Sequence, residues 1–160
     1  MNRQAMVHIP RLERCQVWEY VQELRQYRGN RPDQFTIHGQ DMKRSEYVGR
    51  IGEYALAKFL GVPYPFHITG DMDGDVAGYQ VRTRSRHYYD LPTYDRDAPG
   101  IYVLATFEPD AGNGLVILHG WTDLAATLDP ERWATHLPFP CYLTRQRELK
   151  PMGTLEHCYD

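Results

Sequence analysis

The fold class is decided by Tyr79-Gln80-Val81-Arg82-Thr83-Arg84, a stretch whose side chains alternate in character. Successive side chains of a β-strand point to opposite faces. One face is therefore expected to carry residues 79, 81 and 83, and the other Gln80, Arg82 and Arg84. Gln80 and Arg82 leave such a strand about 6–7 Å apart, so both can reach one phosphate-sized site. The stretch predicts a half-buried strand with a polar, cationic face.

Two apolar stretches after this strand predict the centre of a sheet. Residues 101–107 and 115–119 are almost continuously apolar, which is typical of strands covered on both faces. The turn Asp110-Ala111-Gly112-Asn113-Gly114 between them predicts a hairpin. His119 falls within the second apolar stretch, where we expect a hydrogen-bonded core histidine.

Apolar residues at helical spacing predict two amphipathic helices before the strands, over residues 12–27 and about 41–60. Residues 29–40 lack periodicity and predict a loop. Gly61 and Pro63 are expected to end the second helix. Gly49 and Gly52 thin one face of that helix and suggest close approach to another backbone.

The C-terminal part is less regular. Asp129-Pro130-Glu131 is typical of a helix start, so we expect a helix through Trp133 and Leu137. Prolines then predict turns around one edge strand, Cys141 to Thr144. Trp133, like the other two tryptophans (Trp18 and Trp121), is expected in the core.

Together these elements predict one α/β domain with a mixed central sheet flanked by helices. The 160 residues, 42% of them apolar, suffice for a single core. We divide residues 1–160 into an N-terminal helix and loop (1–40), a core (41–121), and a C-terminal helix and turns (122–160).

Composition narrows the classes of function. With 18 Lys and Arg against 21 Asp and Glu, the net charge of −3 gives no overall basic field, so a nucleic acid must be bound by a local patch. The 3 cysteines are odd in number and widely spaced, which fits neither a disulfide framework nor a paired-cysteine zinc site. We expect reduced thiols in a cytoplasmic protein. The absence of a long apolar run argues against a membrane partner.

Short motifs in the predicted core resemble the PD-(D/E)XK nuclease superfamily. They are Gly49-Arg50-Ile51-Gly52-Glu53-Tyr54-Ala55, then Asp75 followed by Gln80-Val81-Arg82, then the two apolar strands. More narrowly, residues 75–83, with Tyr102-Val103-Leu104 and Gly120-Trp121 after them, look like small phage and prophage proteins of this type. The resemblance covers roughly residues 46–121 and implies a restriction-endonuclease-like fold.

The resemblance also implies an activity, the metal-dependent hydrolysis of DNA phosphodiester bonds. Asp75 corresponds to the central ligand of Mg²⁺ (or Mn²⁺), with Glu53 and Gln80 as further ligands and Arg82 at the position of the catalytic base. Gln80 replaces an acidic residue and brings no negative charge. Arg82 replaces lysine, and a protonated guanidinium can hold a phosphate but cannot act as a base.

Simpler roles compete at the same positions. Asp75 precedes a glycine-containing turn and can be a turn residue. Glu46, Arg50 and Glu53 have the spacing of an ordinary salt-bridged helix face.

A second candidate site is a phosphate-binding run, Arg82, Arg84, Arg86 and His87, followed by Tyr88-Tyr89. A solvated strand end beside packed tyrosines explains it equally simply. DNA is the expected partner.

Three functions stay open from the sequence. The protein can be a phage-encoded nuclease, a nucleic-acid-binding module that has lost catalysis, or an interaction protein that inhibits or scaffolds a host protein. A homodimer is compatible with each of them.

Overall fold

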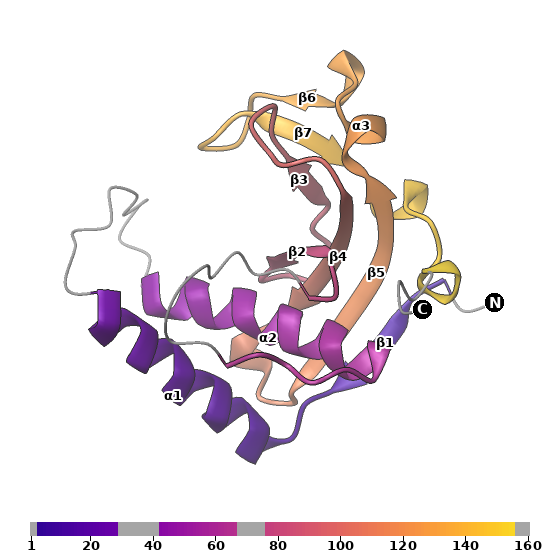
Figure 1. The fold of residues 1–160 in the computed structure, drawn as a ribbon. Coiled ribbons are helices and arrows are strands. Elements are labelled where there is room, and N and C mark those ends of the chain that lie inside the picture. The colour runs from indigo at the N-terminus through magenta and orange to yellow at the C-terminus, as the bar shows by residue number, and fades with distance from the viewer. Residues whose placement is uncertain (1–2, 29–41, 67–75, 156–160) are drawn as a thin grey trace.

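The protein is described here from a computed structural model that covers residues 3–28, 42–66 and 76–155. Two helices, α1 (Arg11–Arg28) and α2 (Met42–Leu60), lie on one side of a curved sheet (Figure 1). Both predicted helices are confirmed, and Gly61 ends α2 with a positive φ of 71°. The predicted loop at 29–40 lies outside the described residues.

The main sheet is mixed, as predicted. Its four strands run in the order β1-β5-β4-β2, and their bounds are β1 Ala5–His8, β2 Gln80–Arg84, β4 Ile101–Phe107 and β5 Leu115–Asp123. The predicted hairpin is β4 and β5, which pair antiparallel. β2 lies parallel to β4, with Arg84 beside Thr106. The carboxyl ends of β2 and β4 therefore meet at one edge of the sheet. The sequence analysis missed β1, which pairs antiparallel with β5.

The contact between α2 and β2 depends on one glycine. A Cβ atom on Gly52 would overlap the side chain of Thr83 and lie 2.8 Å from its Cβ. Close packing at Gly52 is thus confirmed, although the neighbour is the side chain of Thr83 and not another backbone. The same expectation for Gly49 is wrong, because a Cβ there would meet nothing within 4 Å. Only the Gly49 carbonyl faces β2, where it accepts a 3.4 Å hydrogen bond from the Thr83 hydroxyl.

Apolar side chains form a core on each face of the main sheet. The larger core joins α2 to the sheet and includes Ile51, Leu56 and Val103, all fully buried. The smaller core lies on the opposite face, around Tyr102 and Leu104. α1 packs on the outer side of α2, where the Tyr54 hydroxyl donates a 2.6 Å hydrogen bond to Glu13.

A second sheet corrects the prediction for the C-terminal part. Its three strands are β3 (Leu91–Thr93), β7 (Cys141–Thr144) and β6 (Trp133–Ala134), in that order. β7 was predicted as an edge strand but lies in the middle, with Cys141 buried. The long strands β4 and β5 curve from the helices towards this second sheet (Figure 1).

The helix predicted through Leu137 is wrong. Asp129 does cap a turn, since its side chain accepts a 3.0 Å hydrogen bond from the Glu131 amide. The turn covers only Pro130–Arg132, and β6 follows because Trp133 and Ala134 pair with β7. Trp133 is not in the core either. Its side chain is 45% exposed and packs edge-on against Tyr142.

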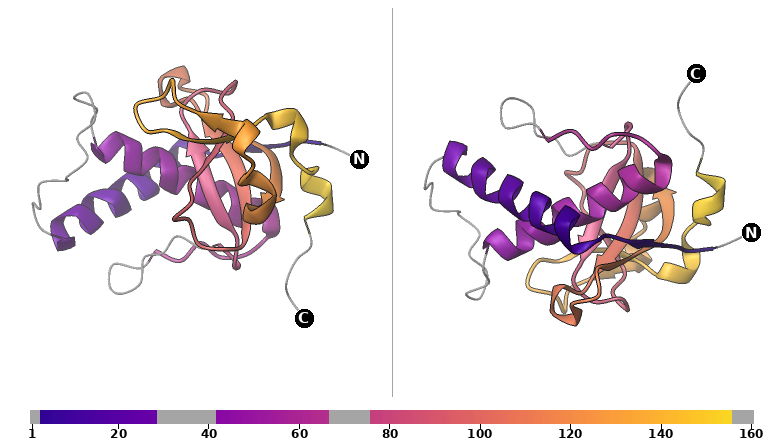
Figure 2. Two further views of the ribbon diagram at one scale, coloured as in Figure 1. Left: turned by 90° about the horizontal axis from the view of Figure 1, so that it is seen from above. Right: turned by 90° about the horizontal axis from the view of Figure 1, so that it is seen from below.

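The end of the described chain returns to its beginning. The Met152 amide donates a 3.1 Å hydrogen bond to the Arg3 carbonyl. Figure 2 shows this last segment beside β1, while α1 and α2 project from the other side of the sheet. The short helix α3 (Leu124–Thr127) follows β5 directly. Across the described ranges, no helix is long and apolar enough to cross a membrane.

The glycine contact yields a stability prediction. Gly52→Ala should destabilise the protein by roughly 1–3 kcal/mol, because the new methyl group must displace Thr83. Gly49→Ala on the same helix is the matched control. It meets open space and should stabilise by up to about 1 kcal/mol through helix propensity. Urea unfolding of both variants measures the difference, and equal midpoints would show that the two glycines are packed alike.

Candidate functional site

The polar face of β2 lies away from α2. Thr83 faces α2 at Gly52, so alternation along the strand directs Arg82 and Arg84 to the opposite side of the sheet. In agreement, the Arg82 guanidinium lies 5.3 Å from the ring centre of Tyr102, a residue of the smaller core. The predicted division of the strand into two faces is confirmed. Glu53, in contrast, belongs to the helix that covers the other face.

Arg82 forms an ion pair that the sequence analysis missed. Its Nη2 donates a 2.6 Å hydrogen bond to Oδ1 of Asp97, whose side chain is only 9% exposed. The second oxygen of Asp97 accepts a 2.9 Å bond from the Tyr94 amide. Asp97 thus offsets the positive charge of Arg82. The signal available in the sequence was only a turn-like stretch, Asp95-Arg96-Asp97, which does not reveal its partner.

Glu53 is held by two donors on the α2 side. It accepts a 3.2 Å hydrogen bond from Arg50 and a 2.8 Å bond from the Tyr64 hydroxyl. Arg50 also lies 3.8 Å from Glu46, so the ion pairs of the simpler interpretation are present, but this helix face is not the solvated one expected, because the three side chains are only 11–18% exposed. Burial, reinforced by the charge of Glu53, raises the pKa of Tyr64 far above its usual value. Tyr64 therefore stays protonated and continues to donate to Glu53.

The predicted metal site lies only partly within the described residues. Glu53 and Gln80 are described, whereas Asp75 is not. Among residues 3–28, 42–66 and 76–155, no three His, Cys, Asp or Glu side chains gather in a way that could hold a metal ion. A site formed by Glu53, Asp75 and Gln80 consequently stays a prediction. Of its three residues, Glu53 lies on α2, and Gln80 lies at the start of β2 beside Tyr102 of β4.

The predicted phosphate-binding run shows three kinds of environment. Arg84 donates a 2.9 Å hydrogen bond to the Asp90 carbonyl and lies 4.4 Å from the ring centre of Tyr89. Arg86 is exposed and bonds only to the neighbouring Ser85 carbonyl in the described structure, at 2.8 Å. His87 is half-buried. Arg86 is therefore the member of this run best placed to contact a ligand.

Behind His87 a chain of hydrogen bonds crosses the sheet. The His87 Nδ1 atom lies 2.8 Å from the Thr106 hydroxyl, which lies 2.7 Å from Nε2 of His119. The Nδ1 atom of His119 lies 3.0 Å from the Gln4 amide. His119 is 2% exposed, and the expectation of a hydrogen-bonded core histidine is confirmed. Burial, with a smaller contribution from His87, lowers the pKa of His119 to about 4.

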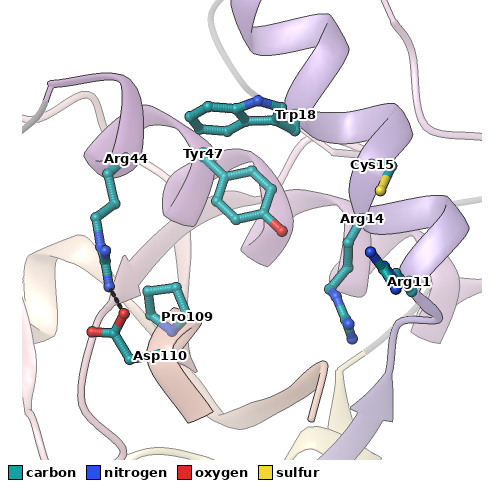
Figure 3. Close-up of a pocket in the computed structure, with 8 residues that line it drawn as sticks. All are labelled: Arg11, Arg14, Cys15, Trp18, Arg44, Tyr47, Pro109 and Asp110. Atoms are coloured by element: carbon teal, nitrogen blue, oxygen red, sulfur yellow. Dashed lines mark ion pairs between the residues drawn. The ribbon is translucent and has the colours of Figure 1, made fainter. Parts of the chain in front are cut away.

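The structure also contains a pocket of about 400 Å³ that the sequence analysis did not predict. It lies between the first turns of α1, the beginning of α2 and the short turn Pro109–Ala111 after β4 (Figure 3). Three arginines line it, Arg11, Arg14 and Arg44, together with the aromatic rings of Trp18 and Tyr47. The first two arginines and Trp18 are spaced three and four residues apart along α1, which was the only sequence signal.

Positive charge from two distant parts of the chain meets at this pocket. Arg44 forms an ion pair with Asp110, the only carboxylate among the described lining residues. The hydrogen bond from Arg44 holds the pKa of Asp110 below its usual value, and the nearby charge of Arg86 lowers it further. Arg86, two residues after the end of β2, therefore lies on the Asp110 side of the pocket. We call Arg11, Arg14, Arg44 and Arg86 the basic surface.

Comparison of the chain with known proteins found no relative. No protein-family model matches the chain, and no curated protein or solved structure shows significant similarity to it.

The buried histidine yields a prediction about pH. The pKa of His119 is about 4 in the folded protein, against about 6.5 in an unfolded chain. Between these values the unfolded state takes up a proton that the folded state does not. Stability should therefore fall as the pH drops from about 6.5 to about 4, by roughly 2–3 kcal/mol from this residue alone.

His119→Gln is the comparison variant, because it keeps a polar side chain but cannot titrate. Urea unfolding at several pH values should show a steeper loss of stability in the parent than in this variant. Carboxylates titrate in both proteins, so the difference between the two curves isolates His119. Parallel curves would contradict the lowered pKa.

Proposed function

We propose that the protein binds the phosphate backbone of DNA through the basic surface. The observation that supports this function is that Arg11, Arg14 and Arg44 line one pocket whose single described carboxylate, Asp110, is paired with Arg44 and feels the charge of Arg86, in a chain of net charge −3. Clustered like charges repel each other and weaken the folded state. An anionic partner removes this cost.

The chemistry of the basic surface favours a polyphosphate chain over an isolated anion. Arginine presents planar, forked donors that match phosphate oxygens. Arg11 and Arg14 belong to α1, Arg44 belongs to α2, and Arg86 follows β2. The four cations therefore extend over a surface and are not confined to one point. Tyr88 is exposed two residues after Arg86 and offers a ring on which a base can stack.

Salt dependence tests this proposal. Arg86→Ala should weaken binding of a short DNA duplex and reduce the slope of log affinity against log salt concentration by about 0.9, the value for one lost phosphate contact. Fluorescence anisotropy titrations at several salt concentrations measure the slope.

Lys150→Ala is the matched control, because it removes the same charge from an exposed residue that packs on Trp121 in the far half of β5. It should leave the slope unchanged. If both variants behave like the parent, Arg86 does not contact DNA. If the two lower the slope equally, the binding reflects total charge and not the basic surface.

A second candidate function, metal-dependent cleavage of DNA, rests on the carboxylate of Glu53 and would need a cation reached from both faces of the sheet, because Gln80 shares the face of Arg82. The carboxylate side chain of Glu53 is only 13% exposed, and Tyr64 ties it to the chain shortly before the segment that carries Asp75. Glu53, Asp75 and Gln80 would hold Mg²⁺ or Mn²⁺, which would activate water for attack on the phosphate.

Asp75→Ala tests the metal site directly. The variant should lose Mn²⁺ binding in calorimetry and Mg²⁺-dependent cleavage of plasmid DNA, because it removes the central oxygen ligand. Asp73→Ala, two residues away in the same polar stretch, is the matched control and should keep both. Cleavage that survives Asp75→Ala would rule out this site. If the parent protein binds DNA in a salt-dependent way but never cleaves it, only the proposed binding function would stand.

A further inference from the structure

Building on the proposed DNA-binding function, we propose that the arginine pocket holds the terminal nucleotide of a DNA strand that ends in a phosphate monoester. Arg11 and Arg14 would bind the terminal phosphate. The base would lie against the aromatic wall formed by Trp18 and Tyr47. The basic surface would then guide the strand, and the pocket would select its end.

The size of the pocket favours a single nucleotide. Its volume of about 400 Å³ falls in the range of pockets that enclose small ligands, roughly 300–1,000 Å³. A duplex is too wide to enter such a hollow, and its internal bases are stacked and paired. A strand end avoids the cost of unstacking an internal base, which is a few kcal/mol.

The charge of the pocket favours a monoester over a diester. No hydrogen bond or ion pair holds the Arg11 side chain in the part of the chain that the structure describes. The Arg14 side chain hydrogen-bonds there only to the Ile9 carbonyl, at 2.9 Å, and Arg44 is offset by Asp110. Two positive charges therefore lack a carboxylate partner. A terminal phosphate carries about −1.5 to −2 charges at pH 7, whereas an internal diester carries one.

Arg14 is fixed in place before any ligand arrives. Its bond to the Ile9 carbonyl uses one of five N–H donors and leaves the others available. Gly114 packs against the guanidinium, and a Cβ atom at this glycine would overlap it. The Ile9 amide in turn donates a 2.9 Å hydrogen bond to the Gly114 carbonyl. A guanidinium held in this way loses little freedom when it binds a phosphate.

The aromatic wall supplies the second half of the site. Trp18 and Tyr47 meet edge-on, with ring centres 5.3 Å apart and planes at 88°. Figure 3 shows both rings on the same side of the pocket, with the Tyr47 hydroxyl directed towards Arg14. Burial raises the pKa of Tyr47, so the hydroxyl stays protonated and able to donate to a phosphate oxygen. Bases stack on such rings with little regard to sequence.

The experiment compares one single-stranded oligonucleotide with three kinds of ends: 5′-phosphate, 3′-phosphate, and hydroxyl at both ends. Anisotropy competition in EDTA, which prevents cleavage, gives the three affinities. One phosphorylated form should bind at least about tenfold tighter than the hydroxyl form, as expected for a charge-assisted contact. Arg11→Ala should reduce this preference to less than about twofold, while Lys150→Ala should keep it. Arg11 is exposed, so its loss does not threaten folding.

Cys15 gives a readout at the pocket itself. It lines the pocket and is exposed, whereas Cys141 is buried. A maleimide should label Cys15, and labelling should slow by the factor 1 + [L]/Kd, where L is the oligonucleotide. At a concentration equal to the Kd of the hydroxyl form, the phosphorylated oligonucleotide should therefore slow the labelling about fivefold more than the hydroxyl form does. Mass mapping of the peptide that contains Cys15 follows the reaction. A Cys15→Ser variant verifies the assigned peptide.

The outcomes separate this inference from the function on which it rests. Salt-dependent DNA binding without any preference for a phosphorylated end would overturn the pocket assignment and leave the basic surface standing. Absence of binding to all DNA forms would overturn both. If inorganic phosphate protects Cys15 as well as a nucleoside monophosphate does, the aromatic wall does not bind a base. A preference that survives Arg11→Ala would place the end of the strand elsewhere.

Discussion

The contact between Gly52 and Thr83 is the constraint on which the arrangement of side chains depends. Without a Cβ atom at Gly52, α2 can approach β2 until backbone and side chain touch. This approach fixes which face of β2 is covered, and alternation then sends Arg82 to the other face. Glu53 follows Gly52 directly and stays on the helix side. Glu53 and Gln80 therefore start from opposite sides of the sheet, and a metal site that used both would have to bridge them at β2, the last strand in the described order of the main sheet.

The parallel pairing of β2 with β4 has a second consequence, at the carboxyl ends of the strands. Two parallel strands have their carboxyl ends on the same side of the sheet, so the residues after Arg84 lie near the residues after Thr106. Arg86 thereby comes close to Asp110, which Arg44 reaches from α2. An antiparallel pair would have sent the chain after β2 to the opposite edge. The basic surface is thus a result of topology, because its arginines are separated by up to 75 residues in sequence.

Periodic patterns predicted the helices, the hairpin and the two faces of β2, because these features depend on residues close in sequence. Local sequence patterns did not predict the structure where contacts between residues far apart in the sequence determine it. The cap at Asp129 begins a turn as expected, but pairing with β7 then draws Trp133 and Ala134 into a strand. The partner of Arg82 lies 15 residues away, in a turn without a distinguishing pattern. The pocket joins α1, α2 and a turn after β4, and no local pattern spans that distance.

The ion pair between Arg82 and Asp97 bears on whether the protein can cleave DNA. An arginine beside the metal ligands would offset one of their charges and weaken cation binding. Because Arg82 is paired with Asp97, it would not offset the charge of the ligands of the proposed metal site. It also remains unable to act as a base, so the activation of water would depend on the metal alone. The proposed DNA binding, in contrast, would rely on arginines outside this set. The two proposed functions would therefore be separable by mutation, and a variant without the metal site would still bind DNA.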